Sequence, residues 1–191
     1  MGEQVGVAAQ QSGAPVCWVS EGRGGATAER AARAGLTDAG RLVDALSQAE
    51  LVLSVVPPHA AQATAEAVAT HGYSGIYVDL NAVSPATGKR VHDIVCAAGA
   101  TYVDGGIIGP PPKTRGQARL YLAGPDAKVV ASKTRELWAL ASAGAAMRAR
   151  AAAAAAAIIA LKPSHSCVAA ENSSHLDGSV SPLNAPAELA A

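Results

Sequence analysis

The sequence predicts an α/β fold of the Rossmann-like type, a mostly parallel sheet with helices on both faces. Short apolar runs alternate with segments of helical composition from residue 1 to about residue 140, which is the pattern of βαβ units. Gly and Pro residues separate the successive segments, as expected of turns between elements. The run at residues 51–56 is apolar almost throughout, which is typical of a strand buried on both faces of a parallel sheet.

The individual elements follow from local composition. Strands are expected at residues 16–19, 51–56, 76–80, 101–103 and 118–122, and helices at residues 3–11, 27–33, 59–70, 86–98 and 125–143. Thr37 or Asp38 is a suitable cap for a further helix that continues through Leu46. From residue 145 the composition changes: alanines 151–157 favour a helix, and residues 172–191, rich in Ser, Asn and Pro, are expected to be poorly ordered.

Length and composition exclude several functional classes. A chain of 191 residues suits one domain, or one domain with a tail. Lys and Arg total 15 and Asp and Glu total 15, so the chain lacks the charge excess of a nucleic-acid-binding protein. Three scattered cysteines do not form a disulfide framework. The sequence shows neither a signal peptide nor a run of ~20 apolar residues that could span a membrane. We therefore expect a cytoplasmic protein with no membrane or nucleic-acid partner.

The region after residue 160 contains a loose group of metal-ligating side chains. His165, Cys167 and His175 occur there, but their spacing matches no standard zinc pattern. We expect no metal site.

Ligands of parallel sheets bind at the carboxyl ends of the strands, and the first candidate motif there is residues 22–27. These residues fit a phosphate-binding turn at a helix N-terminus only in part, because Thr27 stands where the third glycine of G-x-G-x-x-G would fall. An ordinary flexible turn is an equal alternative. In a third interpretation Arg23 follows the second strand of a dinucleotide fold and accommodates the 2′-phosphate of NADP, while Glu21 keeps NAD possible.

Three further motifs follow other strands. Residues 54–58 end a strand in Pro57-Pro58, and residues 79–85 place small polar groups at a strand end. Residues 104–110 contain three glycines, which indicate close approach of the backbone to another group. Each motif also has a purely structural interpretation: a strand terminator, a helix cap before Pro85, and a wide turn.

Taken together, residues 16–122 resemble the NADP-binding domain of the 6-phosphogluconate dehydrogenase and 3-hydroxyisobutyrate dehydrogenase superfamily, in its bacterial 6-phosphogluconate dehydrogenase-like branch. The strings that carry the resemblance are Ser20-Glu21-Gly22-Arg23, the segment 53–60 (LSVVPPHA), the segment 78–87 (VDLNAVSPAT) and the segment 103–112 (VDGGIIGPPP). The resemblance implies residues 1–143 as an NADP-binding Rossmann-like domain and residues 144–191 as an Ala-rich helix and tail. It also implies a helical second domain through which members dimerise.

The resemblance implies a set of cofactor-binding residues. Ser20 and Arg23 would bind the cofactor, with Arg23 on the 2′-phosphate of NADP. Val56 and Pro57 would line its ribose side, and Asn81 would lie near the nicotinamide.

Other positions would serve the phosphate loop, the substrate and catalysis. Gly2 falls on the last glycine of the family's phosphate loop. Gly105, Gly106, Ile108 and Gly109 would form the substrate loop, and Ile108 stands where many members have serine. Lys162 is the candidate catalytic lysine, although Pro163 follows it.

Two departures from the family pattern affect the expected fold. The first strand and the earlier glycines of the phosphate loop have no counterpart, and this strand is central in the usual order, so its neighbours are expected to lack a partner. The helical second domain has no counterpart either, as in a frameshifted or truncated gene product.

The expected function is that of an NADP-dependent oxidoreductase that acts on a small-molecule substrate, with this chain carrying mainly the cofactor-binding domain and showing little turnover. The alternative is a non-catalytic nucleotide-binding remnant. In a third hypothesis residues 22–27 are themselves the phosphate loop, and replacing Gly24 would abolish binding.

Overall fold

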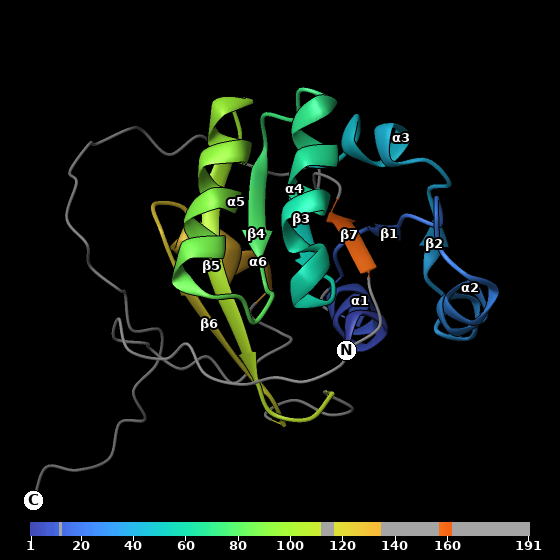
Figure 1. Ribbon diagram of the computed structural model, residues 1–191. Helices are drawn as coiled ribbons and strands as arrows, with labels where there is room; N and C mark the ends of the chain where they lie inside the picture. The colour runs from blue at the N-terminus through green and yellow to red at the C-terminus, as the bar shows by residue number, and fades with distance from the viewer. Residues whose placement is uncertain (12, 112–116, 135–156, 162–191) are drawn as a thin grey trace, which may run out of the picture.

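The computed structural model describes residues 1–11, 13–111, 117–134 and 157–161. Within them the chain forms a seven-stranded sheet in the order β2-β1-β7-β3-β4-β5-β6. The neighbours β1 and β2, β3 and β4, and β4 and β5 are parallel, whereas β7 and β6 are antiparallel to the strands they pair with. The predicted fold class, a mostly parallel sheet with helices, is confirmed (Figure 1).

Most element bounds agree with the sequence-based expectations. The helices are α1 (Gly2–Gln11), α2 (Gly25–Arg33), α3 (Leu42–Leu46), the 3₁₀ turn η1 (Pro58–Ala60), α4 (Ala61–Thr70), α5 (Pro85–Ala97) and α6 (Ala127–Thr134). The strands are β1 (Val16–Trp18), β2 (Thr37–Asp38), β3 (Leu51–Val55), β4 (Ile76–Asp79), β5 (Thr101–Ile108), β6 (Arg119–Ala123) and β7 (Ala157–Leu161).

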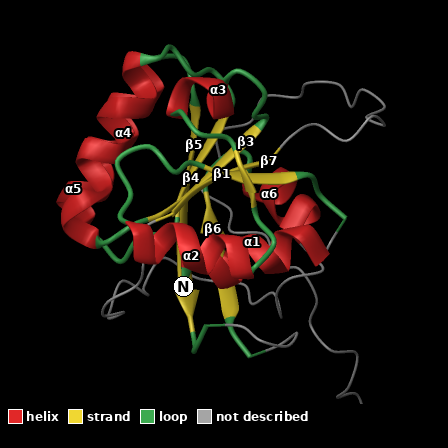
Figure 2. Cartoon of the chain, turned by 90° about the vertical axis from the view of Figure 1, so that its right-hand side faces the viewer, coloured by secondary structure: helices red, strands yellow, loops and turns green. Residues whose placement is uncertain are grey.

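Alternating side chains of the buried strands supply two hydrophobic cores, one on each face of the sheet. Leu51, Leu53 and Val55 of β3 pack in the core that also contains residues of α1, α2 and α6. Val52 faces the opposite core, which is built with α3, α4 and α5. The sheet therefore lies between two helical layers (Figure 2), and this arrangement leaves the strand ends as the place where polar loops meet.

The position between β1 and β3 is filled by β7, which lies far from both strands in the sequence. Cys17 of β1 and Val52 of β3 both align with Ala160, and both pairings are antiparallel. The expectation that β1 and β3 would lack a partner is therefore wrong in this structure. The reason is that a slot between two strands offers hydrogen bonds on both sides, and an apolar segment satisfies them in either direction.

This strand also corrects part of the expected Ala-rich helix. Ala157, the last of the alanines 151–157 that were expected to be helical, is the first residue of β7, because pairing with two strands outweighs the helix propensity of alanine there. The remainder of that helix, the domain boundary at residue 143 and the tail lie outside the described residues.

Two further expectations need correction. Thr37–Asp38 pairs with β1 as the short strand β2 rather than capping a helix, and α3 begins only at Leu42. The glycine-rich residues 104–108 continue β5 rather than forming a wide turn, because they pair with β6. Within the described ranges no helix is long and apolar enough to cross a membrane.

Candidate functional site

The loops after β1, β3 and β4 meet the middle of β5 at one edge of the sheet, which we call the carboxyl rim (residues 20–23, 56–57, 81 and 105). The strand register sets this arrangement, because Ser54 aligns with Asp79 and Asp79 aligns with Asp104. Carboxyl ends of neighbouring parallel strands are where α/β proteins bind their ligands. The structure thus brings most of the predicted site residues to a single edge.

A tight turn follows β1 and carries Arg23. The amide of Arg23 donates to the carbonyl of Ser20 (2.9 Å), and Gly22 has a φ of 69° that favours glycine. The amide of Glu21 donates to the carbonyl of Gly40 (3.0 Å), which ties the turn to the loop before α3. These bonds fix the backbone that presents the Arg23 side chain.

The two charged side chains of this turn differ in their partners. Oε2 of Glu21 accepts a hydrogen bond from the amide of Leu42 (2.9 Å), so the carboxylate is engaged at the start of α3. Arg23 is half-buried, and its Nε is buried with no hydrogen-bond partner among the described residues. Burial lowers the pKa of the Arg23 guanidinium from its ordinary value, yet arginine keeps its charge. A partly desolvated cation without a partner is suited to an anionic ligand.

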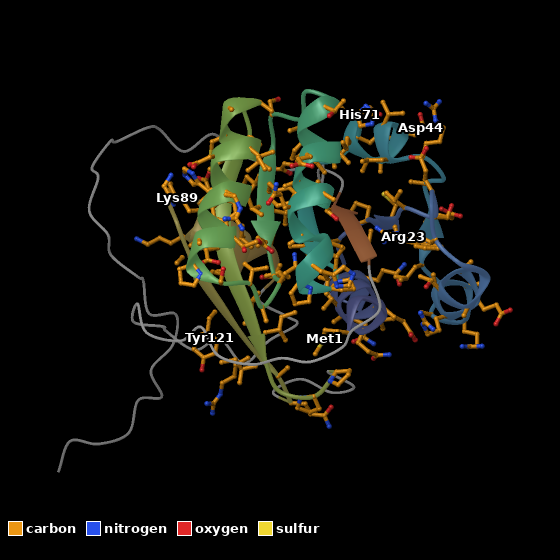
Figure 3. All side chains as sticks on the ribbon, in the orientation of Figure 1. Met1, Arg23, Asp44, His71, Lys89 and Tyr121 are labelled. Atoms are coloured by element: carbon orange, nitrogen blue, oxygen red, sulfur yellow. The ribbon has the colours of Figure 1, made fainter. Side chains whose placement is uncertain are left out.

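Arg23 lies on the same side of the molecule as β2 and α2 (Figure 3). Helix α2 begins two residues later at Gly25, with Gly24 as an N-cap that makes no side-chain hydrogen bond. A Cβ added at Gly24 or Gly25 would meet no atom within 4 Å. Packing within the chain therefore does not require glycine at either position.

The ends of β3 and β4 are joined by the side chain of Asn81. Its Oδ1 accepts from the amide of Val56 (2.6 Å), and its Nδ2 donates to Oγ of Ser54 (3.0 Å) and to Oδ1 of Asp79. Asn81 and Val56 are buried, and Pro57 is half-buried. The predicted cofactor residues of β3 and β4 are thus bonded to each other.

The carboxyl group of Asp79 lies in a low-dielectric environment. Its Oδ2 is buried with no partner, as is Oη of Tyr77, two residues earlier on the same face of β4. Burial, and to a lesser extent the nearby charge of Asp104, raises the pKa of Asp79 to about 6, against the lowering effect of the hydrogen bonds from Asn81. Burial and Asp79 likewise raise the pKa of Tyr77.

The predicted phosphate-loop residue Gly2 is the first residue of α1 and is buried. This helix packs against β1 and β7, and its N-terminus lies at the end of the molecule toward which β5 runs (Figure 1). Burial lowers the pKa of the Met1 amine.

The predicted substrate loop is a strand that extends beyond the rim. Gly105, Gly106 and Ile108 align with residues of β6, past the point where β4 ends beside Asp104. A Cβ at Gly105 would overlap Leu80 Cδ2 and lie 3.3 Å from the Asp79 carbonyl oxygen, so the Leu80 side chain would have to move to accept any other residue there. Gly109 follows the strand with a φ of 130°. These residues stand next to the rim as a two-stranded ribbon.

Some predicted residues cannot be placed. Lys162 and the group His165, Cys167 and His175 lie outside the described residues. Within the part that is described, no three His, Cys, Asp or Glu side chains form a group that could hold a metal ion.

The sequence-based site omitted Ser54 and Asp79. Both belong to motifs that were singled out there, at the ends of two buried strands. A buried polar residue in an otherwise apolar strand is the signal that would have found them, because such a group needs a partner.

No protein-family model matches the sequence, and no curated protein matches it. Solved structures do match. A conserved protein of unknown function (MTH1747), described as structurally similar to 3-hydroxyacid dehydrogenases, has a TM-score of 0.62 and 26% identity, covering 72% of this chain and 52% of its own. The 3-hydroxyisobutyrate dehydrogenase of Mycobacterium tuberculosis has a TM-score of 0.62 and 14% identity, covering 73% and 50%.

A reductive aminase from Aspergillus terreus, solved with NADPH and ethyl levulinate, has a TM-score of 0.52 and 18% identity, covering 72% of this chain and 50% of its own. This chain therefore spans about half the length of the proteins it matches.

The sheet, the two helical layers and the carboxyl rim define a Rossmann-like oxidoreductase-type fold. More particularly, the solved structures that the chain resembles include a 3-hydroxyisobutyrate dehydrogenase, a protein described as similar to 3-hydroxyacid dehydrogenases, and reductive aminases solved with NADPH. The predicted resemblance is thereby confirmed.

Proposed function

We propose that this chain binds NADP along the carboxyl rim and forms the cofactor-binding part of an oxidoreductase. The observation that carries the proposal is Arg23, a half-buried guanidinium that follows a parallel strand and whose Nε has no partner in the part of the chain that the structure describes. An arginine at this point of a dinucleotide fold accommodates a 2′-phosphate. NADPH-bound reductive aminases among the structural neighbours add support.

The neighbouring carboxylate favours NADP over NAD. An acidic side chain that selects NAD must accept hydrogen bonds from the ribose hydroxyls. Oε2 of Glu21 already accepts a hydrogen bond from Leu42, whereas Arg23 forms no ion pair with another described residue. We therefore assign the 2′-phosphate to Arg23.

The other residues of the rim fit the parts of a dinucleotide beyond its 2′-phosphate. Gly2 at the start of α1 would face the pyrophosphate, Ser20 the adenosine side, and Val56 with Pro57 the ribose side. Bound nicotinamide supplies hydride transfer, and Gly105 to Gly109 would flank the substrate. Lys162 stays the candidate for proton transfer. We envisage a cytoplasmic enzyme whose substrate is a hydroxy acid or an imine.

A titration of the purified chain with NADPH and NADH, followed by tryptophan fluorescence or calorimetry, tests the proposal. Wild-type chain should bind NADPH more tightly than NADH. Arg23→Ala should weaken NADPH binding by about tenfold or more, because a hydrogen bond to a charged group contributes about 1.5–3 kcal/mol, and should leave NADH binding unchanged.

Arg33→Ala is the matched control, since it removes the same charge from the exposed last turn of α2. Equal binding of the two cofactors, or equal effects of the two substitutions, would contradict the proposal.

NADPH binding without turnover of any hydroxy acid or imine would favour the second candidate function, a non-catalytic nucleotide-binding protein.

A further inference from the structure

The Asn81 side chain has no free donor with which to bind a ligand. Its two Nδ2 hydrogens are used by Ser54 and Asp79, its Oδ1 accepts from Val56, and its backbone amide donates to Oδ1 of Asp79 (3.0 Å). The Asn81 carbonyl accepts from the amide of Val83 (2.9 Å). The resemblance gave Asn81 a role in direct cofactor contact, but this bonding pattern points to a role within the rim.

Asp79 is the origin of this arrangement. It contributes two of the bonds that orient Asn81, through the single atom Oδ1, and it is fully buried. Without that acceptor, the Asn81 amide and one Nδ2 hydrogen would lose their partners in a buried position. The side chain of Asn81 would then no longer be held in the orientation that meets the Val56 amide at 2.6 Å.

Val56 connects this network to the proposed ligand. It is the residue directly after β3, at the point where the chain turns toward η1. Neighbouring strands lie about 4.8 Å apart, so in the order β1-β7-β3-β4 the ends of β3 and β4 are about 10 and 14 Å from the end of β1. A dinucleotide with its 2′-phosphate at Arg23 must therefore extend its other half over Val56 and Asn81.

We propose that Asp79 is a positioning residue of the carboxyl rim: it holds Asn81, which fixes the Val56 turn against which the nicotinamide half of the dinucleotide lies. The inference rests on the proposed NADP binding and adds a specific division of the site. Arg23 controls the 2′-phosphate end, and the Asp79–Asn81 pair controls the opposite end.

Two probes separate these ends. NADPH spans the whole rim, whereas adenosine 2′,5′-bisphosphate carries the adenine, the ribose and the 2′-phosphate but no nicotinamide half. Asp79→Leu removes the Oδ1 acceptor and should weaken NADPH binding by about tenfold, as expected for the loss of buried hydrogen bonds. It should leave binding of the bisphosphate within twofold, whereas Arg23→Ala should weaken both probes.

Asp79→Asn is the conservative variant. It keeps an Oδ1 acceptor in the same place, so NADPH affinity should be retained within about threefold if that acceptor is what matters. Asn81→Ala should reproduce the effect of Asp79→Leu, and the double variant should lose no more than either single variant, because the residues act in series. If Asp79→Leu fails to fold, Asn81→Ala decides the question by itself.

Thr134→Val controls for general destabilisation. It removes another buried polar group, whose Oγ1 donates to the carbonyl of Val130 (2.8 Å) in α6, away from the rim. It should lower stability without changing the affinity for either probe. In ¹H–¹⁵N spectra of the unliganded chain, the Val56 amide should shift in Asp79→Leu and keep its position in Asp79→Asn.

The outcomes distinguish the two proposals. Wild-type chain that binds neither probe overturns the proposed function, and the inference with it. The inference alone is overturned if the wild-type chain binds both probes and Asp79→Leu either weakens the binding of both probes equally or weakens neither.

Discussion

Replacing Gly109 by alanine should destabilise the chain by much more than an ordinary surface substitution. Gly109 follows β5 with a φ of 130°, a conformation that side-chain-bearing residues rarely adopt. A Cβ there would lie 2.6 Å from the Gln117 carbonyl oxygen and 2.9 Å from the Ala118 Cα. Both are backbone atoms, so the hairpin between β5 and β6 must itself move.

The magnitude combines two costs. The disfavoured backbone conformation contributes about 1–2 kcal/mol, and the overlap with the opposing backbone contributes about 1–3 kcal/mol, as for other overpacked sites. The free energy of unfolding of Gly109→Ala should therefore fall by about 2–5 kcal/mol. Urea unfolding followed by circular dichroism measures the change.

Gly106→Ala is the matched control from the same ribbon. A Cβ at Gly106 would meet nothing within 4 Å, and its φ is not in the positive range. Alanine there should be neutral or stabilise by about 0.5–1 kcal/mol, because it restricts the unfolded chain. Equal stability changes for the two variants would refute the reasoning about this hairpin.

Three further predictions concern the core and the sheet. Tyr77→Phe should raise the free energy of unfolding by about 1 kcal/mol, because it removes a buried hydroxyl with no partner; a lower stability by urea unfolding would contradict this. The raised pKa of Asp79, about 6, means that the native state binds a proton more tightly than the unfolded chain. The contribution of Asp79 to stability is therefore present below its unfolded pKa and is lost as pH rises through about 6, by about 3 kcal/mol in all; Asp79→Asn should lack this component of the pH profile, and identical profiles would contradict the assignment. Ile159→Pro should destabilise by about 2 kcal/mol or more, because proline in a central strand removes a ladder donor; retention of wild-type stability in thermal unfolding would show that β7 does not hold the sheet together.

Most of the fold could be predicted from the sequence because the elements are locally encoded. The apolar run of β3 and the Gly-terminated helices have composition signals that tertiary packing reinforces. The extension of β5 past Asp104 could not be predicted, because two consecutive glycines, Gly105 and Gly106, are typical of a turn. Gly105 instead leaves room for the Leu80 side chain beside the strand, whereas a Cβ at Gly106 would meet nothing within 4 Å, and only the assembled sheet reveals this difference.

The candidate site was predicted unevenly for a related reason. Arg23 and Val56 follow strands whose positions were correct, so their place at the rim followed. The bond from Asn81 to Ser54 joins residues far apart in the sequence, and the bond from Asn81 to Asp79 joins two residues at the end of the same strand. No local pattern specifies which buried polar groups will become partners, because the strand register decides it.

The position of β7 imposes an order on how this protein can be assembled. The β1–β2 pair and the sheet of β3, β4, β5 and β6 are made early in synthesis, yet among the described strands none joins them until Ala157–Leu161 arrives. Until then β1 and β3 each present an open edge that can recruit strands from other nascent chains. Production of soluble protein should accordingly depend on how promptly the last strand is released from the ribosome, and a partner that shields the two edges during that interval would improve the yield.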